Sequence, residues 1–230
     1  MLSLDLHTHT RFFHGHDRLA HRFDPYGHAA LAAFAKRRGL DGVALTNHDY
    51  YRPLGSALDG FLSIPGIEIS TTEGHVVVLG SDPPTRTKKG ELTPEEAVEL
   101  AHDRDCVAII AHPFRNSTIR ETDIAFDAIE CNGKHPRTWP LVRELAEERG
   151  IPLVGGSDAH YPFEVGRAYT RIDADPTPES VVEAIRRGRV EPEVAGGPFA
   201  RLLRRGYQQV HERKGQLTET TPGIGTPPES

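Results

Sequence analysis

Close to the start of the chain, the stretch Asp5-Leu6-His7-Thr8-His9-Thr10 follows residues 1–4, in which apolar and polar side chains alternate. That alternation predicts a short β-strand. On an extended backbone, side chains two positions apart point to the same side. Because neutral imidazole is the commonest metal ligand among side chains, His7 and His9 predict the first two nitrogens of a metal site.

Further apolar runs along the chain end in ligand-type side chains. Residues 42–46, 106–111 and 152–156 predict buried strands, and each run is followed within a few residues by a histidine or an aspartate. Residues 64–69 predict another strand, and a turn at 71–74 leads into a returning strand, as in a hairpin. The candidate ligands at these positions are His48, Glu68, His75, His112, Asp158 and His160.

Helical patterns alternate with these strands. A helix is expected to begin at Asp24, which can cap it, and Pro25, and to end before Gly39. Further helices are expected from the capping box at residues 93–96 and over residues 139–149. Strands that alternate with helices indicate parallel β-α units, and continuous apolar strands indicate a sheet that is covered on both faces.

Two α/β architectures fit this alternation, a closed barrel and an open doubly wound sheet. A barrel gathers the C-terminal ends of all its strands round one mouth, whereas an open sheet does so only near its switch point. Ligand-type residues follow four of the expected strands, and Glu68 lies near the end of a fifth. This distribution favours the barrel.

The length of 230 residues is typical of one large domain. We expect a single domain over residues 1–212, with a core at 1–190 and a C-terminal helical extension at 191–212. From Gly215 onward the chain consists almost entirely of Thr, Pro, Gly, Ser and Glu. Residues 213–230 are therefore expected to form a disordered tail.

The composition, 37% hydrophobic and 26% charged, is that of a globular protein. A net charge of −6 argues against non-specific electrostatic binding to nucleic acid or to an anionic membrane, although it is compatible with a local basic patch. Cys106 and Cys131 each lie in an apolar run, so we expect buried thiols rather than a disulfide. With neither a signal peptide pattern nor an apolar run of membrane-spanning length, the sequence favours a cytoplasmic protein.

Imidazole and carboxylate ligands without a usable cysteine pair suit Zn, Mn or Fe far better than Ca or Mg. A catalytic zinc needs about three protein ligands, so the number of candidates predicts two or three ions that share bridging carboxylates. Sites of this kind hydrolyse phosphate esters well. The sequence has no G-x-S-x-G nucleophile elbow, which argues against a serine hydrolase.

Six short motifs follow one another along the chain: HTHT, TNHD, GIEI, EGH, AHPF and GSDAH. As an ordered set over roughly residues 1–190 they resemble the polymerase and histidinol phosphatase (PHP) family. The resemblance implies a distorted (β/α)7 TIM-like barrel, a cluster of up to three metal ions and phosphoesterase activity.

The resemblance also implies three sets of ligands. Those of the first ion would be His7, His9, Glu68 and Asp158. Those of the second, which shares Glu68 as a bridge, would be Glu68, His75 and His112. Those of the third would include His48 and His160. A metal-bound water held by Glu68 and Asp158 would be the nucleophile.

The chain departs from the family after HTHT, where an aspartate is usually found. Here the sequence reads Arg11-Phe12-Phe13-His14-Gly15-His16-Asp17. Two neutral imidazoles leave the charge of a divalent ion poorly compensated, so a carboxylate is the better third partner. We therefore expect Asp17 to complete the third site, with His14 and His16 as alternatives.

Phosphate needs cationic partners besides metal ions. The candidates on the expected active face are Arg11, Arg115, Lys134 and Arg167. For each of them, a solvated side chain is the competing interpretation.

We therefore expect a metal-dependent phosphoesterase that acts on a phosphorylated small molecule, a nucleotide or an oligonucleotide. One alternative is an amidohydrolase-like C–N hydrolase, which also begins with H-x-H, although the middle strands offer Glu68 and no lysine at a strand end. The other alternative is a non-catalytic module that a metal stabilises. The substrate, the identity of the metals and the oligomeric state remain open at this point.

Overall fold

The computed structural model describes residues 1–10, 17–55, 58–115 and 117–196. Its strands are β1 (Leu2–Thr8), β2 (Gly42–Leu45), β3 (Leu62–Ser70), β4 (His75–Leu79), β5 (Val107–Ala111), β6 (Ala128–Asn132), β7 (Leu153–Gly156), β8 (Ala168–Ile172) and β9 (Val190–Val194). Its helices are α1 (Asp17–Arg37), α2 (Pro94–His102), α3 (Trp139–Arg149) and α4 (Pro178–Arg186).

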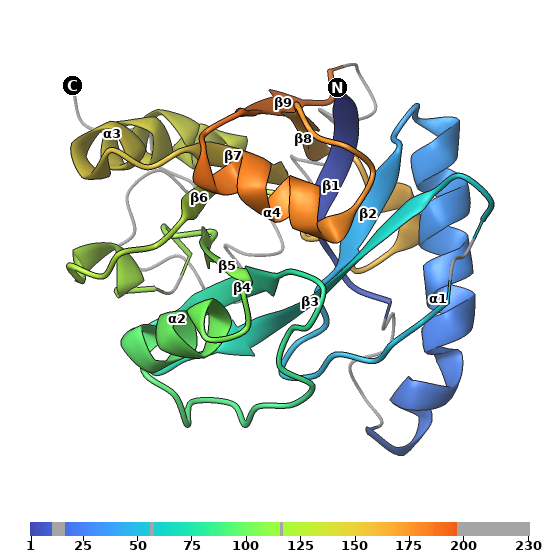
Figure 1. Ribbon diagram of the computed structural model, residues 1–230, viewed down its shortest axis with the longest axis horizontal. Coiled ribbons are helices and arrows are strands. Elements are labelled where there is room, and N and C mark those ends of the chain that lie inside the picture. Colours follow the sequence, from blue (N-terminus) through green and yellow to red (C-terminus); the bar gives the residue numbers. More distant parts are fainter. Residues whose placement is uncertain (11–16, 56–57, 116, 197–230) are drawn as a thin grey trace.

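All nine strands form one sheet in the order β7-β6-β5-β4-β3-β2-β1-β8-β9. The sheet curls until β7 meets the other end, where Gly155 N–H donates to Thr170 Oγ1 of β8 at 2.8 Å and Ala159 pairs with Thr8 of β1. The result is a nearly closed barrel with helices around it (Figure 1). The predicted α/β barrel is therefore confirmed.

The barrel departs from a regular (β/α)7 arrangement because several neighbouring strands run antiparallel. The tight turn after Ser70 makes β3 and β4 a hairpin, and β4 also pairs antiparallel with β5. β8 pairs antiparallel with both β1 and β9. The parallel pairs are β1–β2, β2–β3, β5–β6 and β6–β7.

The apolar core explains why the polar site lies at one end of the barrel. α2 and α3 pack their buried residues against the outer face of the sheet, in a cluster with Ile67 and Ile110. α4 packs against a second cluster, which includes Leu4 near the start of β1. The start of β1 is thus covered by apolar side chains, and the ligand-type residues lie at the opposite ends of the parallel strands.

The predicted start of the first helix is wrong. α1 begins at Asp17, and Pro25 lies inside it. Asp24 is buried and does not cap a helix, since it accepts hydrogen bonds from Thr10 Oγ1 at 2.9 Å and Tyr50 O–H at 3.0 Å. Tertiary partners have here outweighed a local capping pattern.

The C-terminal prediction is wrong at its first residues, because 191–194 belong to β9 rather than to a helical extension. The helix expected at 199–212 and the tail expected at 213–230 lie outside the described residues. Cys106 and Cys131 are both buried and free. None of the described helices is long and apolar enough to cross a lipid bilayer.

Candidate metal centre

The barrel brings eight of the predicted ligands together at one end. They come from the strands or from the loops that directly follow them: His7, His9, His48, Glu68, His75, His112, Asp158 and His160. Ring centroids of His9 and His160 lie 4.2 Å apart, and those of His75 and His112 lie 5.1 Å apart. Side chains from residues that lie far apart in the sequence therefore form one cluster.

A local irregularity in β1 helps to position His7. The pairing of β1 with β2 shifts register between Asp5 and Thr8. Asp5 is fully buried and accepts the backbone N–H of Ser157 at 2.9 Å, which ties β1 to the loop after β7. As a result, Leu6 and His7 both line the interior although they are adjacent in sequence. A bulge of this kind can redirect a side chain.

Glu68 lies at the centre of the cluster and is fully buried. Its Oε1 lies 2.6 Å from His75 Nδ1 and 3.1 Å from His112 Nε2. Its Oε2 lies 3.0 Å from His48 Nδ1 and 3.2 Å from His7 Nε2. The two oxygens thus face two different groups of imidazoles, as a bridging carboxylate would.

Asp158 is also fully buried, and its two oxygens face different partners. Oδ1 lies 3.2 Å from His9 Nε2 and 3.2 Å from His160 Nδ1. Oδ2 lies 2.9 Å from Arg115 Nη1 and 3.2 Å from Lys134 Nζ. One oxygen therefore belongs to the imidazole cluster, and the other holds two cationic side chains beside it.

The backbone at two of these ligands is held in the left-handed region. Asp158 has a φ of 51° and His112 a φ of 29°. Residues other than glycine adopt such angles at a cost, and they do so most often where a site fixes the geometry. Here the two residues lie just after β5 and β7, where the backbone leaves the barrel.

Several buried ligand atoms in the cluster form no hydrogen bond of good geometry, although nitrogen and carboxylate oxygen atoms there lie as little as 3.0 Å apart. They are His7 Nε2, His9 Nε2, Glu68 Oε2 and Asp158 Oδ1. Buried polar atoms without partners are rare in proteins because each costs the full desolvation of the group. Divalent cations would give all four atoms a partner, so the residues present fit a metal centre.

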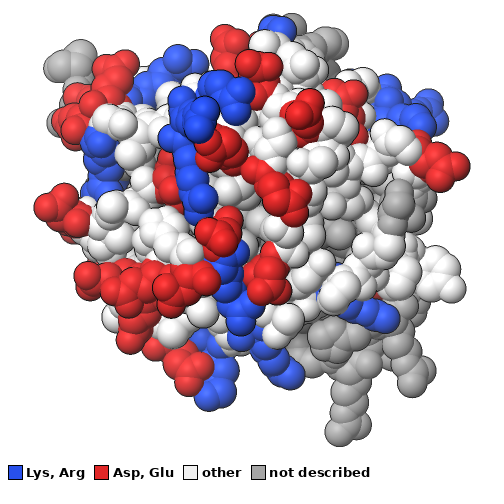
Figure 2. Space-filling view, in the orientation of Figure 1, with Lys and Arg blue, Asp and Glu red and all other residues white. Residues whose placement is uncertain are grey.

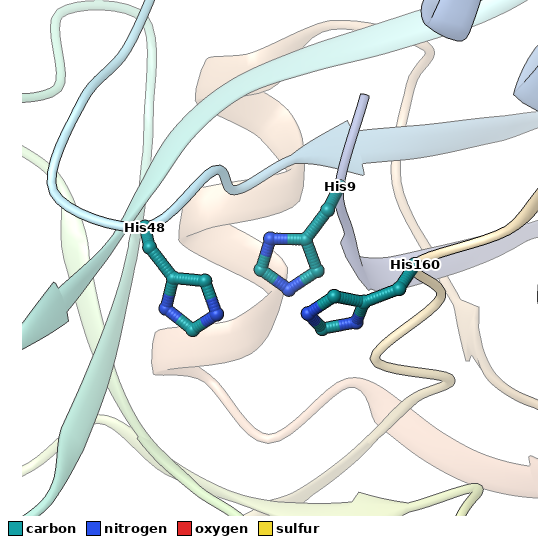
Figure 3. Close-up of side chains that lie close together, drawn as sticks. All are labelled: His9, His48 and His160. Atoms are coloured by element: carbon teal, nitrogen blue, oxygen red, sulfur yellow. The ribbon is translucent and has the colours of Figure 1, made fainter. Parts of the chain in front are cut away.

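Three sets of ligand atoms lie close enough together to hold an ion. Within each set the atoms are within 4.8 Å of one another, and the sets are His7, His9 and Asp158; His9, His48 and His160; and His48, Glu68 and His75. Figure 3 shows the second set, in which nitrogen atoms of the three rings face a common space. Nitrogen and oxygen donors of this kind suit Zn, Mn or Fe.

These sets differ in detail from the expected ones. His48 lies with Glu68 and His75, whereas His112 reaches Glu68 but belongs to none of the three sets. Asp17 begins α1, but its side chain lies outside the described structure, as do His14 and His16. The third site therefore has His9 in addition to its two expected histidines, and its carboxylate stays a prediction.

Electrostatics hold the two carboxylates in the form that binds metals and divide the imidazoles. Burial acts against protonation of His7 and His48, but the neighbouring carboxylates outweigh it and raise the pKa of both, whereas burial lowers the pKa of His9. Burial raises the pKa of Glu68, but the imidazoles of His48 and His7 outweigh it and hold the pKa well below its usual range. Burial also acts against ionisation of Asp158, and Lys134 outweighs it there, so that this pKa is lowered too. Burial and the Arg115 guanidinium lower the pKa of His112 to about 4. Ionised carboxylates and neutral imidazoles are the forms that bind cations.

For Glu130 the sequence leaves two roles equally open, at the mouth of the barrel or at a cap or strand edge, and the structure places it against the metal-ligand candidates. Its Oε1 lies 2.9 Å from His7 Nδ1, and its Oε2 accepts the backbone N–H of His112 at 2.8 Å. It is 2% exposed and lies in β6, whose five residues are all buried. A carboxylate in an otherwise apolar, buried strand is the feature of the sequence that points to a role in the site.

The four predicted phosphate-binding residues differ in where they lie relative to the metal centre. Arg115 and Lys134 both lie against Asp158 at the centre. Arg167 is 3% exposed and its Nη1 lies 3.6 Å from Glu164 Oε1, so the structure places it beside Glu164, and a role in binding phosphate stays a prediction. Arg11 lies outside the described residues.

A cavity of about 530 Å³ opens beside the centre and gives it room for a substrate. The metal-ligand candidates His75 and His112 line it together with Arg115. The hydrolytic chemistry expected from the ligands therefore has both a cationic environment and a space in which to act.

Comparisons with known proteins agree with this geometry. Residues 140–190 match the family model described as PHP-associated. No curated protein matches the chain with significance. The solved structure of PsfC from Pseudomonas syringae shares the fold with a TM-score of 0.67 and 19% identity, over 91% of this chain and 98% of PsfC.

Two solved structures with informative names share the fold over 84% of this chain. A two-domain protein from Bacteroides vulgatus, named as containing a predicted PHP-like metal-dependent phosphoesterase, has a TM-score of 0.61, 22% identity and 64% of its length covered. The lesion-specific endonuclease Q from Pyrococcus furiosus has a TM-score of 0.57, 19% identity and 57% of its length covered. This chain thus spans less than two thirds of either protein.

The fold also occurs in a solved amidohydrolase from Chromobacterium violaceum, with a TM-score of 0.55 and 18% identity over 82% of this chain and 97% of that one. At such identities the likeness to solved structures shows the fold alone. The PHP-associated match and the fold shared with these structures together support a PHP family protein.

Proposed function

We propose that this chain is a metal-dependent phosphoesterase with two or three divalent transition-metal ions, Mn, Zn or Fe, at its strand ends. The observation that carries the proposal is the group of buried ligand atoms on His7, His9, Glu68 and Asp158 that converge on one another without forming hydrogen bonds. When bound, such ions lower the pKa of a water molecule and neutralise charge on phosphate oxygens. This is the chemistry that phosphate-ester hydrolysis needs.

The remaining side chains have distinct tasks in this proposal. Glu68 and Asp158 would hold the cations and orient the attacking water. Arg115 and Lys134, which both contact Asp158 Oδ2, present positive charge next to the place where phosphate oxygens would lie. Glu130 holds His7 through Nδ1 so that Nε2 faces the centre.

A small phosphorylated molecule or a nucleotide is the substrate class that we favour over extended nucleic acid. Endonuclease Q, which shares the fold, has been solved with a duplex substrate that contains an abasic lesion. This chain, however, carries a net charge of −6. On the face shown in Figure 2, acidic and basic side chains of the described residues are interspersed and form no continuous basic surface. Buried free thiols agree with a reducing, cytoplasmic location.

Hydrolysis of a C–N bond is the second candidate, since an amidohydrolase shares the fold. A metal-stabilised module without activity is the third. The two cations at Asp158 favour a phosphate over a neutral amide, because they complement an anionic substrate.

One assay separates the three candidates. Hydrolysis of p-nitrophenyl phosphate is measured on the purified protein before and after chelation, and again after Mn, Zn or Fe is added back. We expect loss on chelation, recovery with metal, and loss in His9→Ala but not in His102→Ala, a surface histidine that pairs with Asp127. Undiminished activity in metal-free protein would overturn the proposal, and so would hydrolysis of p-nitroacetanilide in place of the phosphate ester.

A further inference from the structure

The cavity beside the metal centre has a lining that selects for a particular substrate. Its volume of about 530 Å³ lies within the usual range for sites that bind small molecules. Besides His75 and His112, the residues that line it are Ser70, Thr71, Thr72, Glu73, Gly74, Lys89, Arg115, Ser117 and Thr118. Five of these nine carry a hydroxyl group.

The lining offers hydrogen bonds rather than a stacking surface. Apart from the imidazoles of His75 and His112, no described residue that lines the cavity is aromatic. Sites that hold a nucleobase usually stack it on an aromatic side chain. The cavity therefore fits a hydroxylated leaving group better than it fits a nucleoside.

Two cations line the cavity, and only one of them belongs to the metal centre. Arg115 reaches Asp158 at 2.9 Å. Lys89 forms no hydrogen bond or ion pair with the residues that the structure describes, whereas its neighbour Lys88 pairs with Glu91 at 2.9 Å. Lys89 is exposed to solvent, so its side chain can turn toward the cavity that the residue lines and bind an anion there.

The backbone holds the Lys89 segment against the cavity wall. Gly90 N–H donates to Ser70 O at 2.7 Å, and Thr72 N–H donates to Leu92 O at 2.9 Å. Lys89 is thus anchored to the end of β3 and to the turn that follows. The carboxylate of Glu73 also lines the cavity and can accept hydrogen bonds from hydroxyl groups.

We propose that the cavity holds the leaving group of a small phosphomonoester that carries hydroxyl groups and a second anionic group, and that Lys89 binds this second anion. The inference rests on the proposed function and adds its substrate class. The second anion is a carboxylate or a further phosphate, since either would pair with the ammonium group. Arg115 and the metal centre would then receive the phosphate that is cleaved.

The test compares kcat/KM for four substrates with the intact metal-loaded protein. Glycerol 3-phosphate has hydroxyls but no second anion, 3-phosphoglycerate adds a carboxylate, fructose 1,6-bisphosphate adds a phosphate, and AMP adds a nucleobase. We expect at least one of the two doubly anionic substrates to exceed glycerol 3-phosphate and AMP by about tenfold, the value of one charged hydrogen bond. The better of the two identifies the second anion.

Lys89→Met and Lys88→Met provide the matched pair of variants. The preference for the doubly anionic substrate over glycerol 3-phosphate should fall about tenfold in Lys89→Met, recover in Lys89→Arg and stay unchanged in Lys88→Met. A best rate with AMP, or an unchanged preference in Lys89→Met, overturns the inference. If p-nitrophenyl phosphate is still hydrolysed in a chelator-sensitive way in that case, the proposed function stands without it.

Discussion

His7 Nδ1 lies 2.9 Å from Glu130 Oε1, although the two residues are 123 positions apart in the sequence. The hydrogen bond fixes the orientation of the ring, so that Nε2 faces Glu68 at 3.2 Å. The other oxygen of Glu130 accepts the backbone N–H of His112. One carboxylate outside the ligand sets therefore orients one imidazole and the start of the loop that carries another.

The first prediction follows from this hydrogen bond. Glu130→Gln keeps the size of the side chain but removes the charge, and its amide can turn an N–H toward His7 and favour the wrong tautomer. Loss of such a supporting partner usually costs about 10- to 100-fold in metal affinity. Metal retained after dialysis against graded chelator concentrations measures the effect. Asp127→Asn is the control, since Asp127 contacts His102 and Ala108 away from the centre, and equal retention in both variants would contradict the role of Glu130.

The second prediction concerns Glu68, whose two oxygens face different imidazoles. Glu68→Gln removes the negative charge and places an amide donor among ring nitrogens, so we expect it to lose more than one ion per chain. His112→Ala, which removes one outer ligand, should lose at most one ion. Elemental analysis of both purified variants gives the comparison. Full occupancy in Glu68→Gln together with loss in His112→Ala would show that Glu68 is not a bridge.

Much of the site could be anticipated from the sequence because its ligands follow apolar strands. A ligand-type residue directly after a buried run, such as His112 after residues 107–111, must lie at the strand end, and parallel strands share that end. No local sequence pattern predicts the hydrogen bond between Glu130 and His7. It depends on which strands become neighbours inside the barrel.

Two parts of the fold were hidden from local patterns for physical reasons. Asp24 and Pro25 have the composition of a helix start, but buried contacts with Thr10 and Tyr50 keep Asp24 inside α1. β9 contains Pro192 flanked by two glutamates, a composition that disfavours strands. It is tolerated because β9 is the last strand of the sheet order and pairs only with β8.

The third prediction is a pH dependence that follows from His112, whose pKa burial and Arg115 lower from 6.5 to about 4. As the pH falls below 6.5, His112 becomes protonated in the unfolded chain, whereas in the folded protein it stays neutral until the pH approaches 4. The contribution of His112 to stability is therefore complete above pH 6.5 and is lost as the pH falls through about 4. Urea unfolding of metal-free protein and of His112→Gln over this range measures it. The wild-type protein should lose stability more steeply than the variant, and parallel curves would contradict the shift.

The fourth prediction concerns the closure of the barrel. A Cβ atom at Gly155 in β7 would clash with the backbone carbonyl oxygen of Tyr169 in β8. Gly155→Ala should therefore force β7 and β8 apart and lower the free energy of unfolding by about 2 kcal/mol, as overpacking does elsewhere. Urea denaturation provides the value. Gly196→Ala is the control, since no atom of the described residues lies within 4 Å of a Cβ there, and a similar small effect in both variants would mean that the two strands separate freely.

The last prediction concerns the carboxylate of the third site. His9, His48 and His160 form a set of three neutral ligands, and the last two are partly exposed. The carboxylate oxygen beside His9 and His160, Asp158 Oδ1, also belongs to the first set, so a further carboxylate would be needed to balance the charge of an ion held by these imidazoles. The loop after His9 offers His14, His16 and Asp17, and we expect Asp17, the first residue of α1, to supply the missing charge. Asp17→Ala should then lower metal content by about one ion and reduce turnover strongly, because a third ion needs that ligand.

Two further variants serve as the comparison for Asp17. His14→Ala and His16→Ala should keep their metal content, measured by elemental analysis on protein purified in the same way. Asp49→Ala is a control for an acidic residue near His48 whose carboxylate instead accepts the backbone N–H of Ser70 at 2.8 Å. If Asp17→Ala retains its ions while His14→Ala or His16→Ala loses one, the loop supplies a nitrogen ligand, and the charge of the third ion must be balanced by the substrate phosphate instead.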